Sequence, residues 1–363
     1  MRLPFPYRDE PAIVRRNVDA AAAVLDWPQV IETARPWVAA VRENPPPFWA
    51  MESLLKEYPI SKPEGLALMR LAEALLRVPD GATQDRLIED KLKQGGWAEH
   101  ESKGGSLFVA GSAWALGLSA KIIKPGETPE GVVSSLMKRL GLPTVRTATK
   151  QAMRFLGHHF VLGETIGDAL GRARSNESKG YRHSFDMLGE GARTAEDAKH
   201  YFKSYAMAID AIGKAAGNKA LPDRPGISVK LSALHPRYLM THRERVMDEL
   251  VPLVLDLARK AKSYDLNFTI DAEEADRLEL SLDVIDAVFA DTSLDGWNGF
   301  GLAIQAYQKR APEVIAHIVK LAKAHGRTMM VRLVKGAYWD TEVKRAQERG
   351  LKGYPVFTRK AAT

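Results

Sequence analysis

MMVRLVK, residues 329–335, is a short apolar strand that ends in a charged residue and is followed by a helix-patterned stretch. The same unit, a strand and then a helix, recurs at intervals of about 30 to 45 residues in the second half of the chain. Repeats of this kind form right-handed βαβ units, whose strands lie parallel in one sheet. Five such strands are predicted: His183–Leu188, Ile227–Leu231, Phe268–Ile270, Gly301–Ile304 and Met329–Val334.

Polar side chains follow the predicted strands at their carboxyl ends, which is where (β/α)-barrel enzymes build their active sites. A complete barrel has eight strands, whereas this sequence ends at Thr363 after the fifth. We therefore expect an α/β fold in which an N-terminal all-α arm and helical domain precede an incomplete (β/α)8, TIM-type barrel. The strand-end residues are Lys230, Asp271, Gln305, Arg332 and Lys335.

Three parts are predicted along the chain. Residues 1–60 are expected to form a helical arm that Pro28, Pro36 and the triplet Pro45–Pro47 break into short pieces. Residues 61–178, which open on a capping box at Ser61–Glu64, are expected to form an all-α domain and linker. A polar stretch at residues 175–180 precedes the barrel, residues 179–363, whose first crossover helix is expected to start with a capping box at Thr194–Asp197.

Composition excludes some kinds of site. The absence of cysteine rules out thiol nucleophiles, disulfides and cysteine-ligated metals. The net charge of +7 is spread along the chain without a basic run, so we expect no nucleic-acid partner, whereas an anionic ligand or a membrane surface would suit the charge. The longest uncharged run, residues 106–120, is shorter than the ~20 residues that span a bilayer. The expected location is cytoplasmic, with peripheral contact at the inner membrane face left open.

Lys230 lies in GISVKLSAL, residues 226–234, where alternation places Ile227 and Val229 on one face and Ser228 and Lys230 on the other. A lysine inside a barrel is costly to bury without a partner. Three interpretations stay open: a group that binds a ligand, an ion pair with Asp186 or Asp271, or a Schiff-base lysine.

Asp271 ends the third predicted strand and opens the acidic run DAEEAD, residues 271–276. Four carboxylates this close could bind a metal, but acidic residues are also favoured at the N-terminus of a helix. We therefore expect Glu273, Glu274 and Asp276 to enter the following helix, with Asp271 at the strand tip and no metal bound.

The segment VRLVKGAYW, residues 331–339, combines two cations, Arg332 and Lys335, with a glycine and two aromatic rings. Gly336 lets the backbone approach a ligand closely, and Tyr338 and Trp339 offer flat surfaces for stacking. This combination suits an anionic, aromatic cofactor such as a dinucleotide. The chain has no G-x-G-x-x-G fingerprint, which argues against a Rossmann mode. An ordinary strand end with a glycine turn is the alternative.

Gln305 is an uncharged amide at the fourth strand end. Because an amide both donates and accepts hydrogen bonds, it suits a ring system of mixed polarity such as a flavin. A structural hydrogen bond is an equally good interpretation.

Several long stretches resemble the proline dehydrogenase barrel of the proline utilization A family. They are SVKLSALHPRY (228–238), TIDAEEADRLELSLDV (269–284), LAIQAYQKR (302–310) and VRLVKGAYWDTEVKRAQERGLKGYPVFTRK (331–360). SFDMLGEGART (184–194) resembles the first strand and loop of that barrel. EGLALMRLAEALLRVPD (64–80) and RTATKQAMRFLGHHFVLGETI (146–166) resemble the helical domain and linker of the family.

The resemblance implies an FAD enzyme that oxidises L-proline to pyrroline-5-carboxylate and passes electrons to a membrane quinone, as the N-terminal part of a bifunctional enzyme. It also implies a homo-oligomer for the full-length protein. The implied active-site residues are Lys230, Asp271, Tyr338, Glu190 and Asp186, with Glu190 as a gate and Asp186 as a partner of Lys230. The implied flavin-binding residues are Gln305, Arg332, Lys335, Gly336, Ala337, Trp339, Thr358 and Arg359.

The sequence departs from the family pattern at both ends. The last barrel strands of the family, its helix with paired arginines for the proline carboxylate and its aldehyde dehydrogenase domain would follow Thr363, so we expect residues 1–363 alone to be inactive. The chain starts with the arm, as in shorter members without an N-terminal DNA-binding module. Two other functions stay open: a barrel lyase that uses Lys230 as a Schiff base, and a non-catalytic fragment whose arm mediates assembly.

Overall fold

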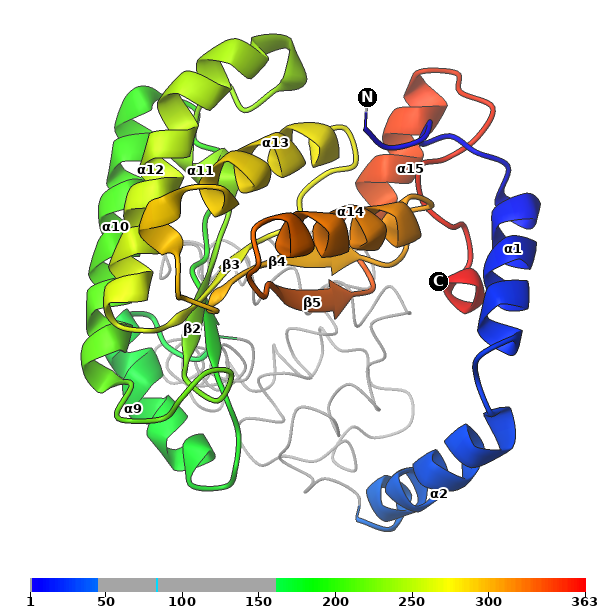
Figure 1. Cartoon of the computed structure of the whole chain (residues 1–363), viewed down its shortest axis with the longest axis horizontal. Helices are drawn as coiled ribbons and strands as arrows, with labels where there is room; N and C mark the ends of the chain where they lie inside the picture. Colours follow the sequence, from blue (N-terminus) through cyan, green and yellow to red (C-terminus); the bar gives the residue numbers. More distant parts are fainter. Residues whose placement is uncertain (1, 45–82, 84–160) are drawn as a thin grey trace, which may run out of the picture. The chain divides into compact units, whose positions relative to one another are not determined.

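The computed structural model describes residues 2–44, 83 and 161–363 (Figure 1). The chain divides into two compact units, one formed by Met1–Asp26 with Thr165–Thr363 and the other by Trp27–Glu164. This division differs from the predicted boundaries at residues 60 and 178. The first residues belong with the strand-containing unit because their side chains bind its helices, as Arg2 does with Asp286 at 2.7 Å.

The strand-containing unit holds one parallel sheet, whose five strands follow one another in sequence order. All five predicted strands are confirmed. Each strand–helix unit therefore places the next strand on the same side of the preceding one, which is the progression found in a barrel. The described strands do not close into a barrel, because the first and the fifth strand are edge strands. The strands are β1 (Ser184–Asp186), β2 (Gly226–Val229), β3 (Asn267–Ile270), β4 (Phe300–Gln305) and β5 (Met330–Val334).

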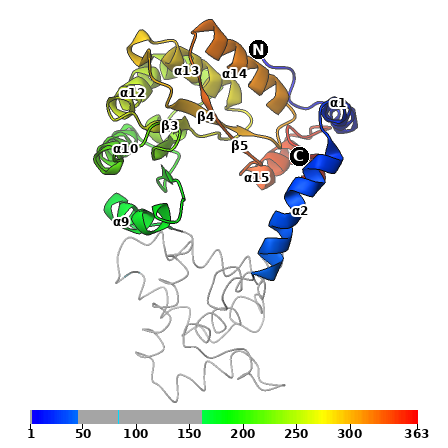
Figure 2. The same ribbon diagram turned by 60° about the horizontal axis from the view of Figure 1, so that its bottom comes forward.

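Most helices follow a strand, and the longer ones between the strands cover one side of the sheet (Figures 1 and 2). Their apolar faces are buried, as Leu250, Val254 and Leu257 show on the helix Arg243–Ser263. The helices are α9 (Ile166–Glu177), α10 (Ala195–Ala215), α11 (Leu231–Leu234), α12 (Arg243–Ser263), α13 (Leu278–Phe289), α14 (Ala311–Ala324) and α15 (Trp339–Glu348). Short 3₁₀ turns lie at Met240–His242, Thr292–Leu294 and Lys360–Ala362.

The core between sheet and helices is aromatic at its centre. The Phe268 and Phe300 rings stack at 6.0 Å across β3 and β4, and Phe289 of α13 meets Phe300 at 5.8 Å. All six residues of β4 are buried, which is typical of a central strand in a parallel sheet covered by helices.

The local signals predicted at the start of the strand-containing unit are mostly confirmed. Thr194 and Asp197 form a full capping box at the start of α10, because each side chain accepts a hydrogen bond from the other residue's backbone N–H. The polar boundary stretch is only partly a loop, since α9 continues to Glu177 before the chain turns at Gly180 with φ of 90°.

The arm is helical at α1 (Glu10–Ala22) and α2 (Trp27–Glu43). The prediction that Pro36 breaks the arm is wrong, because Pro36 lies inside α2. Proline removes one backbone donor from the helix, and here the helix tolerates that loss. Pro28 is the second residue of α2, where no intrahelical partner is lost. The Pro45–Pro47 triplet and most of residues 61–178, including the capping box at Ser61–Glu64, lie outside the described residues.

Within the described ranges, no helix is both long enough and apolar enough to span a bilayer.

Candidate active site

The predicted catalytic lysine and its two predicted carboxylate partners meet at the carboxyl ends of β1, β2 and β3. Lys230 follows β2, Asp186 ends β1 and Asp271 follows β3, and because the strands are parallel these ends share one edge of the sheet. The Lys230 Nζ donates to Asp186 Oδ1 at 2.7 Å and to Asp271 Oδ2 at 2.9 Å. The ion-pair interpretation of Lys230 is therefore confirmed, with both predicted partners.

Arg332 joins the same group from β5. Its Nη2 pairs with Asp271 Oδ1, and its Nη1 donates to Ser228 Oγ at 2.7 Å. The Asp271 side chain is only 6% exposed, so its charge is balanced by two cations rather than by water. Buried carboxylates need such partners.

The charge state of Lys230 follows from these contacts. Burial by itself lowers the pKa of the Lys230 ammonium, but Asp271 and Asp186 outweigh burial and raise the pKa above its ordinary value. A Schiff-base lysine reacts as the neutral amine and needs a lowered pKa. The geometry therefore argues against the lyase alternative.

Tyr338 and Glu190 form a second contact near this edge of the sheet. The Tyr338 hydroxyl donates to Glu190 Oε2 at 3.2 Å, and burial followed by the Glu190 charge raises the pKa of Tyr338. Gly189 and Gly191 flank Glu190 with φ of 120° and 68°. Ser232 Oγ accepts from the Gly191 N–H at 3.1 Å, so one side of this loop is anchored while Glu190 itself is exposed.

Gln305 uses both ends of its amide within the protein. Its Nε2 donates to the Glu273 carbonyl at 2.8 Å, and its Oε1 accepts from the Ala337 N–H at 3.1 Å. Gln305 thus ties the loop after β3 to the loop after β5. The structural interpretation of this residue has direct support, and a flavin contact by Gln305 stays a prediction.

Gly336 occupies a position that only glycine fits. Its φ is 135°, and an added Cβ would lie 2.5 Å from the Tyr307 ring. The same Tyr307 hydroxyl accepts from the Tyr338 N–H at 3.2 Å. Tyr307 therefore packs against the predicted cofactor segment and fixes its backbone by a hydrogen bond. This residue was not singled out from the sequence.

The remaining predicted cofactor residues offer exposed cations and an exposed ring. Lys335 and Arg359 are exposed, and within the described part of the chain no contact engages the Lys335 ammonium. Trp339 is 40% exposed, with its Nε1 donating to the Phe357 carbonyl at 2.9 Å. Exposed cations and a partly exposed indole are the kinds of group that bind the phosphates and rings of a dinucleotide such as FAD. Thr358 instead donates to Glu10.

The acidic run after β3 is a loop, not a helix start. α13 begins at Leu278, so the prediction that Glu273, Glu274 and Asp276 enter that helix is wrong. Hydrogen bonds and ion pairs of Glu273 and Glu274 hold these residues in the loop and explain why the helix starts later. The Glu273 Oε1 accepts from the Ser232 N–H at 2.9 Å, and Glu273 and Glu274 both pair with Arg277, at 2.6 and 3.1 Å.

No group of residues in the described ranges is arranged to hold a metal ion.

Two buried charged residues, Glu342 and Arg310, also hold this loop, and their roles were not predicted from the sequence. The Glu342 Oε1 accepts from the Ala275 N–H at 2.6 Å, and the Arg310 Nη2 donates to the Ala275 carbonyl at 2.9 Å. Burial raises the pKa of Glu342. One sequence signal could have pointed to Glu342. It lies four residues before Ala346 on α15, which places both residues on the inner face of that helix.

Comparison with known proteins identifies the family of the chain. Residues 169–363, more than half of the chain, match the family model described as proline dehydrogenase. The chain belongs to the proline dehydrogenase family. It is 51% identical to the bifunctional protein PutA of Klebsiella aerogenes over 86% of this chain and 24% of that protein. It is 29% identical to proline dehydrogenase 1 of Bacillus subtilis over 54% of this chain and 58% of that protein.

A crystal structure of proline utilization A from Bradyrhizobium japonicum matches with a TM-score of 0.70 and 60% identity, over 99% of this chain and 36% of that one. The chain spans about a quarter of the length of the curated PutA relatives, 24% in the Klebsiella aerogenes protein.

A second family model corrects one expectation. Residues 50–160 match a model described as the DNA-binding domain of proline dehydrogenase. This match contradicts the expectation of no nucleic-acid partner, which rested on the lack of a basic run. Almost all of the matched residues lie outside the described part of the chain.

Proposed function

We propose that this proline dehydrogenase family chain takes part in the FAD-dependent oxidation of L-proline to pyrroline-5-carboxylate, as the N-terminal part of a bifunctional enzyme. The observation that carries the proposal is the linked group of Lys230 after β2, Asp271 after β3 and Arg332 within β5. The names of the relatives, proline dehydrogenase and PutA, support the same reaction.

The reaction removes a hydride from the ring carbon next to the proline nitrogen and a proton from that nitrogen. FAD, when bound, would supply the acceptor for the hydride. On the protein side, Arg332, Lys335 and Arg359 would balance the negative charge of the cofactor, and Trp339 would provide a flat surface beside it. Gly336 and Ala337, which belong to the same segment, would contact the cofactor. Thr358 and Arg359 would lie at its adenosine end, and Gln305 would hold the segment to the sheet.

Lys230 is assigned a binding role. Its raised pKa keeps the ammonium charged at neutral pH, so it is a poor proton acceptor. Two of its three N–H groups bind Asp186 and Asp271, which leaves one donor for the substrate carboxylate. Tyr338, whose pKa is raised, stays a neutral phenol and would line the proline site, with Glu190 as a gate.

The proposal includes three features of the full-length protein. Electrons would pass to a quinone at the membrane surface, so the protein would work in the cytoplasm and contact the inner face of the membrane peripherally. The full-length protein would be a homo-oligomer.

The test is spectroscopic. The purified full-length protein should carry FAD, seen as visible absorbance near the flavin maxima, and L-proline should bleach that absorbance under anaerobic conditions. D-Proline serves as the control substrate. A colourless protein that takes up no added FAD would overturn the proposal.

The family description of residues 50–160 favours DNA binding as a second candidate function. A mobility-shift assay with labelled duplex DNA tests it at two salt concentrations, because phosphate contacts weaken steeply with salt. A duplex that is retarded at neither salt concentration would remove this candidate.

A further inference from the structure

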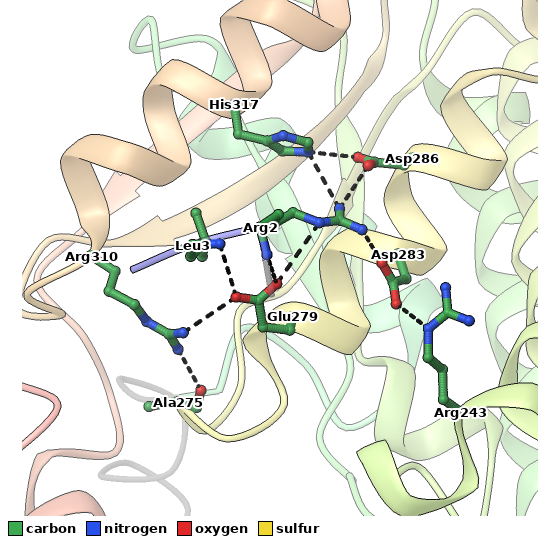
Figure 3. Close-up of polar contacts among 9 residues, drawn as sticks. All are labelled: Arg2, Leu3, Arg243, Ala275, Glu279, Asp283, Asp286, Arg310 and His317. Carbon is green, nitrogen blue, oxygen red and sulfur yellow. Dashed lines mark hydrogen bonds and ion pairs between the residues drawn. The ribbon is translucent and has the colours of Figure 1, made fainter. Parts of the chain in front are cut away.

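The first residues of the chain bind helices of the strand-containing unit that lie far away in the sequence. We name residues 2–16 the N-terminal strap. At its start, Arg2 lies among three carboxylates of α13, Glu279, Asp283 and Asp286, which project from one side of the helix (Figure 3). The Leu3 N–H donates to Glu279 Oε1 at 3.2 Å as well. This end of the strap is thus fixed by charge on α13.

A second anchor lies on α14. Arg8 and Arg16 each contact Glu313 Oε1 at 2.9 Å. The buried Lys309, whose side chain is 2% exposed, donates from Nζ to the Arg8 carbonyl at 3.0 Å. Residues 8–10 are therefore held directly beside the loop that joins β4 to α14.

Glu10, the first residue of α1, reaches the other end of the chain. Its Oε1 accepts from the Thr358 N–H and from the Thr358 hydroxyl, both at 3.0 Å. Its Oε2 lies 3.6 Å from Lys309 Nζ. A carboxylate in the first turn of a helix is favoured by the helix dipole, so Glu10 is in place as an acceptor. Figures 1 and 2 both show α1 beside the C-terminal turn.

The residues just before Thr358 are held by the loop after β4 and by Trp339. The Lys309 N–H donates to the Pro355 carbonyl at 3.0 Å, and the Phe357 N–H donates to the Tyr307 carbonyl at 2.8 Å. Trp339 Nε1 donates to the Phe357 carbonyl at 2.9 Å. At Thr358 the chain becomes exposed, and its backbone and side-chain donors both go to Glu10. The position of Thr358 therefore depends on the strap.

We propose that Glu10 is a positioning residue of the cofactor site, which holds Thr358 and the residues after it where the adenosine end of FAD would bind. The inference rests on the proposed function, in which Thr358 and Arg359 face that end. It makes the N-terminal strap part of the cofactor site, 348 residues away in sequence.

The contact is tested first in the full-length protein without added FAD. Hydrogen–deuterium exchange is followed over residues 355–363. In Glu10→Ala the Thr358 amide should exchange at least about tenfold faster, because it loses its hydrogen-bond acceptor. Arg16→Ala is the matched control, since Arg16 lies on the same helix and contacts Glu313 but not Thr358. Unchanged exchange in Glu10→Ala, or an equal change in Arg16→Ala, would overturn the contact.

The link to the cofactor is tested by FAD affinity. We expect Glu10→Ala to raise the FAD dissociation constant about 3- to 10-fold, from the loss of hydrogen bonds to a charged acceptor. Glu10→Gln keeps one oxygen acceptor and should restore affinity to within about twofold. Faster exchange in Glu10→Ala with unchanged FAD affinity would overturn the positioning role.

A second variant avoids disturbing Lys309. Thr358→Val removes the hydroxyl bond to Glu10 and leaves the Glu10–Lys309 pair intact. The double variant with Glu10→Ala should weaken FAD binding by less than the product of the two single effects, because both remove one shared contact. Full additivity would count against the proposal. If the wild-type protein binds no FAD, the proposed function fails, while the exchange experiment still decides the Glu10–Thr358 contact.

Discussion

At the scale of single residues, Asp271 has the most consequential surroundings. It is buried and accepts from Lys230 on one oxygen and from Arg332 on the other. If either Lys230 or Arg332 is removed, the Asp271 carboxylate keeps the other cation as a partner. We therefore expect the protein to fold without either one. The two cations differ in position, however. Lys230 follows β2 and also contacts Asp186, whereas Arg332 lies within β5, three residues before Lys335.

This difference predicts separable effects. Arg332→Ala should lower the flavin content of the full-length protein, because it removes a cation of the cofactor segment. Lys230→Ala should leave flavin content unchanged and lower proline turnover. The measurements are the flavin-to-protein absorbance ratio and proline-dependent dye reduction, with the exposed Lys352→Ala as control. Equal flavin loss in both variants would contradict this division of roles.

The Tyr338–Glu190 contact predicts a defect in substrate capture. Glu190→Ala should raise KM for proline by about 3- to 10-fold with little change in flavin content, since one charge-assisted hydrogen bond is lost. Tyr338→Phe removes the same bond from the other side and should shift KM in the same direction. Steady-state kinetics with both variants provide the check, and unchanged KM in Glu190→Ala would remove the residue from the site.

At the scale of elements, local signals predicted the strands and the α10 capping box correctly, because each depends on neighbouring residues alone. The start of α13 could not be predicted in this way. Glu273 is held by the Ser232 N–H, 41 residues earlier, and this long-range contact keeps the acidic run outside the helix. Pairing of Lys230 with Asp186 and Asp271 was predictable from parallel strand ends. The supporting roles of Tyr307 and Arg310 depend on packing that has no sequence pattern, whereas Glu342 had one signal, its spacing of four residues from Ala346 on α15.

Two glycines predict opposite effects on stability. An added Cβ at Gly301 of β4 would lie 2.2 Å from the Met330 carbonyl oxygen of β5, whereas one at Gly171 of α9 would meet nothing within 4 Å. Gly301→Ala should therefore lower the free energy of unfolding by about 1–3 kcal/mol through overpacking. Gly171→Ala should raise it by about 0.5–1 kcal/mol, because alanine favours the helix. Urea denaturation of the two variants compares them directly.

The strap predicts an acid-dependent release of α1. Burial alone would raise the pKa of Glu313, but Arg8 and Arg16 outweigh it and lower the pKa from its ordinary 4.5 to about 2. A lowered pKa in the folded state adds stability above pH 4.5, and this contribution is lost as the pH falls toward 2. Exchange of α1 amides, corrected for intrinsic rates, should accelerate in that window. Glu313→Gln should remove this part of the pH dependence.

At the scale of the whole molecule, the order of the strands determines what the chain can do by itself. The described sheet runs from β1 to β5 without closing, so β5 is an edge strand. Val331 and Leu333 on that strand are 47% and 60% exposed, and Ile315 and Val319 of the adjacent α14 are exposed as well. Unpaired, apolar edge strands favour association between chains.

We therefore expect a polypeptide of residues 1–363 alone to retain FAD weakly, to be poorly soluble and not to oxidise proline. Within the Lys230–Asp271–Arg332 group, Lys230 offers one free N–H to the proline carboxylate, and a bidentate arginine grip would bind that carboxylate far better. Dye reduction with L-proline, measured beside the full-length protein at equal concentration, tests this. Light scattering of the same samples reports association through the β5 edge, and Leu333→Lys should reduce the scattering without restoring activity. A soluble 1–363 polypeptide that reduces dye with proline would show that five parallel strands suffice for the reaction.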